Sequence, residues 1–253
     1  MRRGARFSVV VVLALLACVA VAQHQHGDMA AQQDQPAADT GMEHSASQMS
    51  SHHLESSAHM KMTPVRAMRP GDQQRADQIL ASAREAAEKY RDYKVALADG
   101  FQIFLPNIPQ KMYHFTNYRY GFEATFAMNP EHPTSLLYEK QGDGYKLIGV
   151  MYTAPKNSSQ EELDSRIPLS IAQWHAHVNF CAPPREHRAE LFQPGSKFGL
   201  QGSITTQQEC EQAGGKFSPQ VFGWMVHVYP FEKETAQIWS VERQMEHDHG
   251  HMH

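Results

Sequence analysis

The sequence predicts an α+β fold in which an N-terminal amphipathic helix packs on a mainly antiparallel β-sheet. Three observations lead to this prediction. One helical pattern covers residues 72–97, a series of short β-type runs follows it, and two later segments, 173–181 and 222–229, alternate between apolar and polar residues. A helix followed by strands, rather than strands alternating with helices, is typical of an α+β domain with an antiparallel sheet.

The helix is indicated by apolar residues that recur at spacings of three and four. These residues are Ile79, Ala83, Ala86, Tyr90, Tyr93 and Leu97. Residues at this spacing share one face of a helix, which can pack on the sheet. Asp72 is suited to capping the N-terminus, and the sequence Asp99-Gly100 is a typical helix stop.

The β-type runs are separated by Pro, Gly and Asn, which favour turns. We expect strands at residues 101–105, 112–116, 122–128, 135–140, 145–153, 170–181, 221–231 and 236–241. Gln141-Gly142-Asp143-Gly144 is a hairpin turn, because Gly and Asp tolerate the positive φ that such turns need. Residues 155–166 are expected to form a loop with one helical turn, and residues 183–192 and 205–213 short helices.

The first 22 residues have the pattern of a secretory signal peptide. Arg2, Arg3 and Arg6 precede an apolar run, and Ala20-Val21-Ala22 is a small-x-small cleavage site. We therefore expect an exported protein, periplasmic or extracellular, with no stable membrane insertion after the signal is removed. In the alternative, Leu15-Leu16-Ala17-Cys18 is a lipoprotein box and Cys18 carries a lipid anchor.

Charge and cysteine content narrow the expected partners. Removal of the leader leaves 20 Lys and Arg against 27 Asp and Glu, a net charge of −7, so nucleic acid is not expected as a partner. Cys181 and Cys210 remain, and an even pair in an exported chain indicates a disulfide. Closing that loop is worth about 3–4 kcal/mol. Free buried thiols, or a thiolate metal ligand at Cys181, stay open as alternatives.

Composition divides the rest of the chain into one domain and two tails. Residues 23–69 are poor in aromatic and β-branched residues, which predicts a disordered tail. Residues 70–244 are expected to form a single α+β domain, and residues 245–253 a second tail. Both tails are rich in His and Met, whose imidazole and thioether groups suit copper. These residues are His24, His26, Met29, Met42, His44, Met49, His52, His53, His59, Met60, Met62, Met245, His247, His249, His251, Met252 and His253.

The two alternating segments carry the candidate site. A strand has a side-chain period of two, so His175 and His177 share one face while Trp174 and Ala176 take the other. In the second segment His227 alternates in the same way with large apolar residues. If the two strands pair, three imidazoles lie together, which is a common way to bind zinc or copper. The alternative is that these histidines hydrogen-bond in a polar pocket or face water.

Further residues complete the predicted metal site. His114 is the expected fourth group, and Glu139 is expected to contact the ligands from outside, with Asn179 and Tyr229 on the same faces as the histidines. A metal-ligating histidine commonly donates its second ring N–H to such a neighbour.

Several segments together resemble a family of exported bacterial proteins of unassigned function. The resemblance covers about residues 85–230 and depends on five phrases: Ala96-Leu97-Ala98-Asp99-Gly100-Phe101, Tyr113-His114-Phe115-Thr116-Asn117, Leu136-Leu137-Tyr138-Glu139, Leu147-Ile148-Gly149-Val150-Met151-Tyr152, and the late histidine-bearing strand. It implies an exported single-domain fold and draws attention to His114, Glu139 and the late histidines. It implies no reaction, and the Trp-His-x-His-x-Asn-x-Cys form of the late strand departs from the family pattern.

The sequence thus predicts an exported metal-binding protein, with copper favoured over zinc as the bound ion. One His-based site lies in the fold, and the tails buffer further ions. An alternative is a zinc-dependent hydrolytic or hydrating enzyme that uses the same histidines, with an open position for an activated water. A third hypothesis is a metal-free domain that binds a small ligand. The chain contains no HExxH motif, phosphate loop or Ser-His-Asp signature that would support an enzyme directly.

Overall fold

The computed structural model describes residues 57–193 and 195–245. The expectations for the leader, for Cys18 and for the tails at 23–56 and 246–253 lie outside these residues. None of the helices in the described part of the chain is long and apolar enough to cross a membrane.

The sheet contains eight strands and every neighbouring pair is antiparallel, which confirms the α+β prediction. The order is β1-β6-β8-β5-β4-β3-β2, and β7 pairs with β6 outside this path. The strands are β1 (Met60–Met62), β2 (Gln102–Ile103), β3 (Met112–Thr116), β4 (Ser135–Gln141), β5 (Gly144–Ala154), β6 (His175–Ala182), β7 (Lys216–Gln220) and β8 (Trp224–Val228). The strand β6 is shared: its first residues pair with β1 and β8, and its last residues with β7.

The helices are α2 (Asp72–Glu88), α3 (Tyr93–Ala98), α4 (Tyr118–Glu123), α5 (Gln160–Arg166), the 3-10 helix η1 (Arg185–Phe192), α6 (Gln207–Gln212), α7 (Thr235–Ile238) and α8 (Glu242–Met245). The single helix expected at 72–97 is therefore two helices. The side chain of Asp92 accepts a hydrogen bond from the Lys94 N–H and starts α3. The N-cap of α2 is Gly71, at φ 90°, and Asp72 is the first helical residue.

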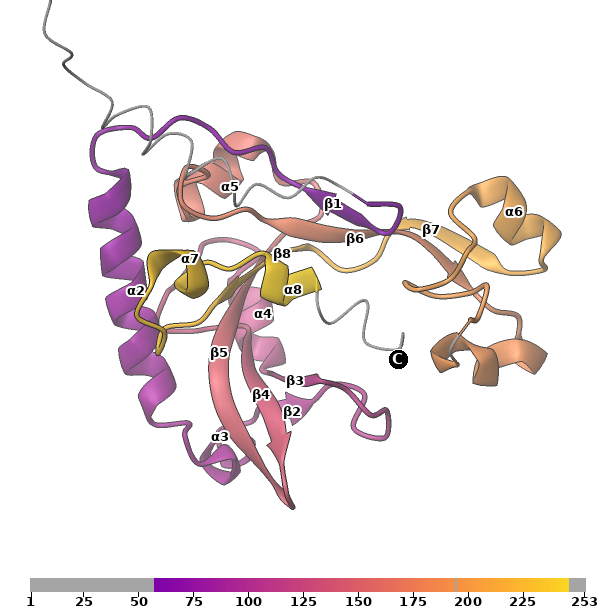
Figure 1. Cartoon of the computed structure of the whole chain (residues 1–253), viewed down its shortest axis with the longest axis horizontal. Helices are drawn as coiled ribbons and strands as arrows, with labels where there is room; N and C mark the ends of the chain where they lie inside the picture. The colour runs from indigo at the N-terminus through magenta and orange to yellow at the C-terminus, as the bar shows by residue number, and fades with distance from the viewer. Residues whose placement is uncertain (1–56, 194, 246–253) are drawn as a thin grey trace, which may run out of the picture. The chain divides into compact units, whose positions relative to one another are not determined.

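The main hydrophobic core lies on the α2 side of the sheet (Figure 1). Three buried alanines of α2 face it, Ala76, Ala83 and Ala87. The sheet contributes the apolar residues of the alternating segments: Trp174, Ala176, Trp224, Val226 and Val228. Small residues on the helix let it approach the strands closely, and the large aromatic side chains fill the space between them.

Two expected strands are absent, and each is replaced by part of a short helix and the turn after it. Residues 122 and 123 end α4, which Asn117 caps by accepting hydrogen bonds from two backbone N–H groups, and a turn follows at 124–126. The aromatic side chains Tyr118 and Phe122 of α4 are exposed and bury no sheet face. At 236–241 the short helix α7 replaces the expected final strand. Apolar residues alone do not distinguish a short strand from a short helix.

The folded part begins before residue 70, which corrects the boundary expected from composition. β1 pairs with β6, with Met60 opposite His177 and Met62 opposite His175. The Thr63 N–H continues the pairing with a 2.8 Å hydrogen bond to the Trp174 carbonyl. Residues 57–69 are therefore part of the fold rather than of the tail.

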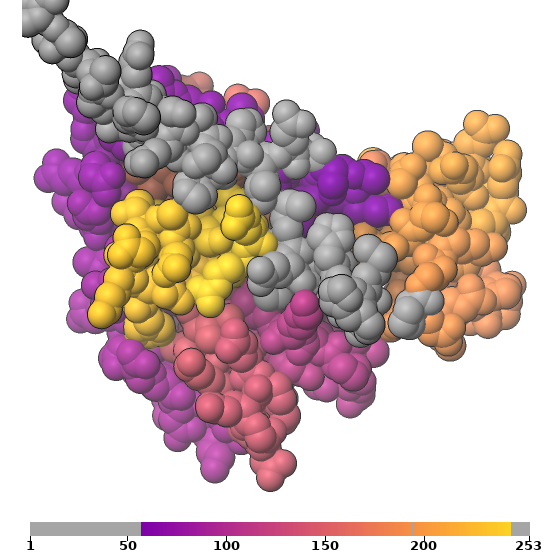
Figure 2. All heavy atoms as spheres, viewed as in Figure 1, coloured from indigo at the N-terminus to yellow at the C-terminus, as the bar shows by residue number. Residues whose placement is uncertain are grey.

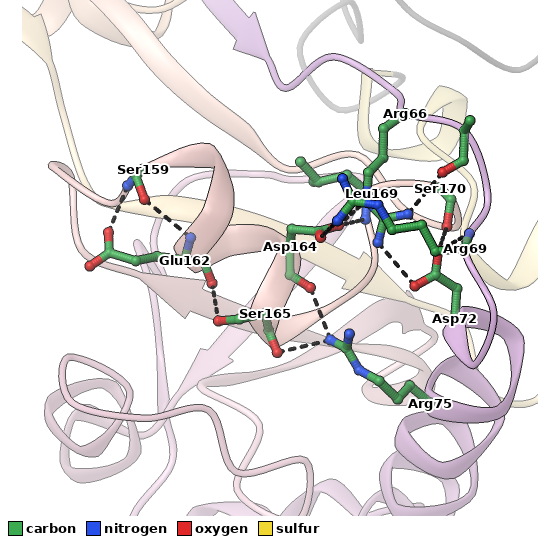
Figure 3. Close-up of polar contacts among 11 residues, drawn as sticks. Arg66, Arg69, Asp72, Arg75, Ser159, Glu162, Asp164, Ser165, Leu169 and Ser170 are labelled. Atoms are coloured by element: carbon green, nitrogen blue, oxygen red, sulfur yellow. Dashed lines mark hydrogen bonds and ion pairs between the residues drawn. The ribbon is translucent and has the colours of Figure 1, made fainter. Parts of the chain in front are cut away.

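An ion-pair network ties this segment to two others (Figure 3). Arg66 donates through both terminal nitrogens to the carboxylate of Asp72, at 2.5 and 3.0 Å, and through Nε to Asp164 at 2.7 Å. Asp72 also accepts from the Ser170 hydroxyl and the Arg69 N–H. The hydrogen bonds from Arg66 hold the pKa of Asp72 well below its usual range, against the opposing effect of burial. Bidentate hydrogen bonds between arginine and a carboxylate are stronger than hydrogen bonds between neutral groups.

The disulfide predicted from the cysteine count is present. Cys181, near the end of β6, and Cys210, in α6, have Cα atoms 5.6 Å apart and their sulfurs bonded. Gly215 lies beside the bridge, and a Cβ at this position would stand 2.6 Å from the Cys181 sulfur. Figure 1 shows the β6–β7 pair continuing from the sheet toward α6. The chain between the two cysteines forms a long loop that leaves the sheet at the end of β6 and is closed by the disulfide.

The first prediction concerns the Arg66–Asp72 pair. Asp72→Asn should lower the free energy of unfolding at pH 7 by about 3 kcal/mol, because it leaves a largely buried guanidinium without one partner. The folded-state pKa of Asp72 is depressed, so its stabilisation is present above the unfolded pKa of about 3.9 and is lost as pH falls below that value. Urea unfolding of variant and native protein should therefore differ less at pH 3 than at pH 7.

The exposed Asp77→Asn on the same helix is the matched control and should change little at either pH. A difference for Asp72→Asn that stays constant from pH 7 to pH 3 would contradict this account.

The second prediction tests the corrected boundary. A chain that starts at residue 57 should keep the urea midpoint of the full chain. A chain that starts at residue 70 loses β1 and Arg66, and should be less stable by several kcal/mol because Asp72 and Asp164 lose their shared partner. Equal midpoints for the two chains would restore the boundary at residue 70.

Candidate metal centre

The candidate site is the sheet face opposite the main core. Four histidines lie on it, His114 on β3, His175 and His177 on β6, and His227 on β8, and we call this set the histidine face. Strand pairing places His114 and His227 on the same face. His114 on β3 is opposite Leu137 on β4, and Leu137 is opposite Gly149 on β5. Met151, two residues after Gly149 on β5, is opposite His227 on β8. His175 and His227 are 2% and 3% exposed, and the other two are partly buried.

The imidazole rings form a row of close neighbours. Ring centroids are 5.5 Å apart for His114 and His227, 5.2 Å for His227 and His175, and 5.5 Å for His175 and His177. For comparison, nitrogen–metal bonds of about 2.0–2.1 Å at tetrahedral angles place two ligating ring centres roughly 5 Å apart. Each neighbouring pair in the row therefore has a spacing that suits a shared ion.

The row is not a finished ligand set. Within residues 57–193 and 195–245, no group of three or more His, Cys, Asp and Glu side chains is arranged to hold a metal ion. The ring spacings therefore describe successive pairs of imidazoles and not a group of three. The predicted site of His175, His177, His227 and His114 therefore stays a prediction, although the structure brings all four residues onto one face.

The closeness of His114 to His227 shows that the sheet is curved. Two strands, β4 and β5, separate β3 from β8 in the strand order, so in a flat sheet the two backbones would stand about 14 Å apart. Rings 5.5 Å apart therefore require the histidine face to be concave. Gly149 lies in this concave region, where a Cβ would stand 2.7 Å from the Val228 carbonyl and 2.9 Å from the Tyr229 ring. Its missing side chain leaves room for the close packing of β8.

The C-terminal segment covers part of this face. Val241 forms a small buried cluster with Met60 and Met62 of β1. Arg243 places its guanidinium 4.4 Å from the centre of the Tyr229 ring and forms an ion pair with Glu232 at 2.8 Å. Figure 2 shows the segment that carries α7, in yellow, at the surface. The chain continues from this cover into the histidine-rich sequence 246–253.

The three residues expected to contact the ligands from outside are placed differently from one another. Tyr229 is fully buried, with its ring centroid 6.4 Å from that of His227. Asn179 donates a 2.7 Å hydrogen bond to the Ala58 carbonyl, so its amide holds the segment that leads into β1. Glu139 is exposed and lies opposite Met112, two pairs beyond the pair of His114 with Leu137. Of the three, Tyr229 is the residue next to a histidine ring.

Sequence reasoning did not include the methionines of this face in the site, although it named Met60 and Met62 as copper donors of the N-terminal tail. Within residues 57–193 and 195–243, five methionines are buried: Met60, Met62, Met112, Met151 and Met225. Four of them belong to three period-two patterns that could have revealed the arrangement: Met60-Lys61-Met62, Met112-Tyr113-His114 and Met225-Val226-His227. In a strand such spacing places both residues on one face.

A second candidate site is a cleft elsewhere on the protein. It has a volume of about 620 Å³ and is lined by residues that include Phe126, Glu162 and Arg166. Its two charged side chains already have structural partners: Glu162 completes the capping box of α5 with Ser159, and Arg166 donates to the Ala124 carbonyl at 2.8 Å. The cleft therefore offers less chemistry than the histidine face.

Comparison of the chain with protein-family models, with curated proteins and with solved structures finds no match, so the functional argument depends on the histidine face itself.

Proposed function

We propose that this chain is an exported metal-binding protein that favours copper over zinc. The histidine face binds the ion in the fold, and the His- and Met-rich sequences at 23–56 and 246–253 collect further ions. The observation that carries the proposal is the row of ring contacts at 5.2–5.5 Å on one concave face.

Two further observations support the proposal. The disulfide is typical of proteins that fold in an oxidising compartment, as expected for export. The donors gathered on this face are imidazoles and the thioethers of methionines opposite them in the sheet, such as Met62 and Met225 opposite His175. That donor set suits copper better than it suits zinc, which is bound in proteins by thiolate, imidazole and carboxylate.

The third prediction tests the histidine face in the full chain. Saturating Cu²⁺ or Zn²⁺ should raise the unfolding temperature, because an ion that binds only the folded state stabilises it by about 2.7 kcal/mol at 100 times Kd. His177→Ala and His227→Gln should lose most of this rise. Each removes one ring from the row, and His227 contacts both His114 and His175. Unfolding temperature reports on the fold and is insensitive to ions held equally by the folded and unfolded chain.

The matched control is His187→Ala, an exposed histidine paired with Glu190 away from the sheet. It should respond to metal as the native chain does. A native chain with no metal-dependent rise, or a His227→Gln chain with the full rise, would overturn the proposal.

The fourth prediction concerns the terminal sequences. Deleting residues 23–56 and 246–253 should lower the number of copper ions bound per chain, measured by elemental analysis after dialysis, because these sequences hold most of the remaining imidazoles. The metal-dependent rise in unfolding temperature should persist, since β1 and the four histidines of the face remain. If the deletion abolishes that rise, the tightly bound ion belongs to the terminal sequences instead.

A further inference from the structure

Every histidine of the face has a methionine next to it in the sheet. Residues directly opposite on paired strands have Cβ atoms about 4.5–5.5 Å apart on the same face, within reach of a methionine side chain. The opposite pairs are His175 with Met62 and with Met225, His177 with Met60, and His227 with Met151. Met112 precedes His114 by two residues on the same strand and so shares its face.

Among the described residues, the buried methionines are all on this side of the sheet. All five buried methionines belong to the two clusters on the histidine side, one with Leu137 and Tyr229 and one with Val241. The buried members of the main core are Ala, Val, Leu, Ile and aromatic residues. Packing alone gives no reason for such a division, because branched aliphatic side chains fill the core on the other side. The feature that distinguishes a thioether from those side chains is its soft sulfur donor.

We propose that the histidine face is a site for cuprous copper with mixed nitrogen and sulfur ligands. His175 and His227 supply the imidazoles, and Met62 and Met225, which flank His175 on either side, supply the thioethers. This inference rests on the proposed function and specifies the oxidation state and the ligands of its site. Soft thioether ligands favour Cu(I) over Zn²⁺. Two imidazoles alone do not complete the coordination of an ion, and the two thioethers supply the further ligands.

The assignment also gives β1 a role. Met62 belongs to β1, a three-residue strand at the edge of the sheet. The ring of His59 next to β1 hydrogen-bonds the Gly202 carbonyl at 2.7 Å, and Thr63 accepts from the Trp174 N–H at 3.0 Å. These contacts fix β1 from both ends and set the register that places Met62 opposite His175. The role of β1 is therefore to place the Met62 thioether beside His175.

The test uses the full chain labelled with ¹³C in the methionine methyl groups. Methyl resonances are assigned from single Met→Leu variants, and the chain is titrated anaerobically with Cu(I) and separately with Zn²⁺. The first equivalent of Cu(I) should shift the methyl resonances of Met62 and Met225 and leave that of Met128, which packs against the main core, in place. Zn²⁺ should leave the resonances of Met62 and Met225 where they are.

A double variant, Met62→Leu with Met225→Leu, measures the contribution of the sulfurs to affinity. Leucine conserves the volume of methionine, so the unfolding temperature without metal should change little. Affinity for Cu(I), from competition with bicinchoninate, should fall by at least about tenfold, a typical effect of removing a group that supports a metal. Affinity for Zn²⁺ should stay near the native value. Met128→Leu is the matched control and should keep native affinity for both ions.

The outcomes separate this inference from the proposed function. Native Cu(I) affinity in the double variant, with ions still bound at the histidines, would overturn the thioether site and leave the metal-binding function standing. Methyl shifts of Met62 and Met225 that occur equally with Zn²⁺ would also overturn it, because they would report a general closure of the face. Absence of binding at the histidine face in the native chain would overturn both.

Discussion

The constraint on which the structure depends is the side-chain alternation of β6 and β8. Trp174 and Trp224 occupy the core side of these strands and are buried to 0% and 6% exposure. A slip of one residue in either strand would move its indole to the concave face and its histidine into the apolar core. The burial of two large rings therefore fixes the position of the imidazoles, although no tryptophan belongs to the site.

Curvature of the sheet brings the histidines on this face together into a candidate site. A flat sheet would leave His114 too far from His227 for their rings to meet, and the concave face brings the two within contact. Gly149 permits the curvature because it has no side chain where β8 approaches. The C-terminal segment then lies across part of the face through Val241 and Arg243. His175 and His227 are almost fully buried, and electrostatic interactions at such positions are stronger than in bulk water.

The fold class, the two faces of the late strands and the disulfide could be predicted from the sequence, because each depends on a local signal: periodicity for the strands and cysteine parity for the bridge. The strand β1 could not, since three residues within a segment of low complexity carry too little pattern, and only pairing with β6 makes them a strand. β7 was missed because Pro219 interrupts its pattern. The position of His114 beside His227 depends on the curvature of the whole sheet, which no local pattern encodes.

The disulfide between Cys181 and Cys210 closes a loop that can tolerate insertions, deletions and substitutions in evolution. The bridge spans a sequence separation of 29, and its anchor lies in β6 beyond the residues that carry the histidines. Because the covalent bond and the β6–β7 pairing hold the base of the loop, its distal part can be lengthened, shortened or replaced with little effect on the register of His175 and His177. Among related chains this is the segment where variation should concentrate, and in engineering it is the natural place to insert a peptide while the concave face stays intact.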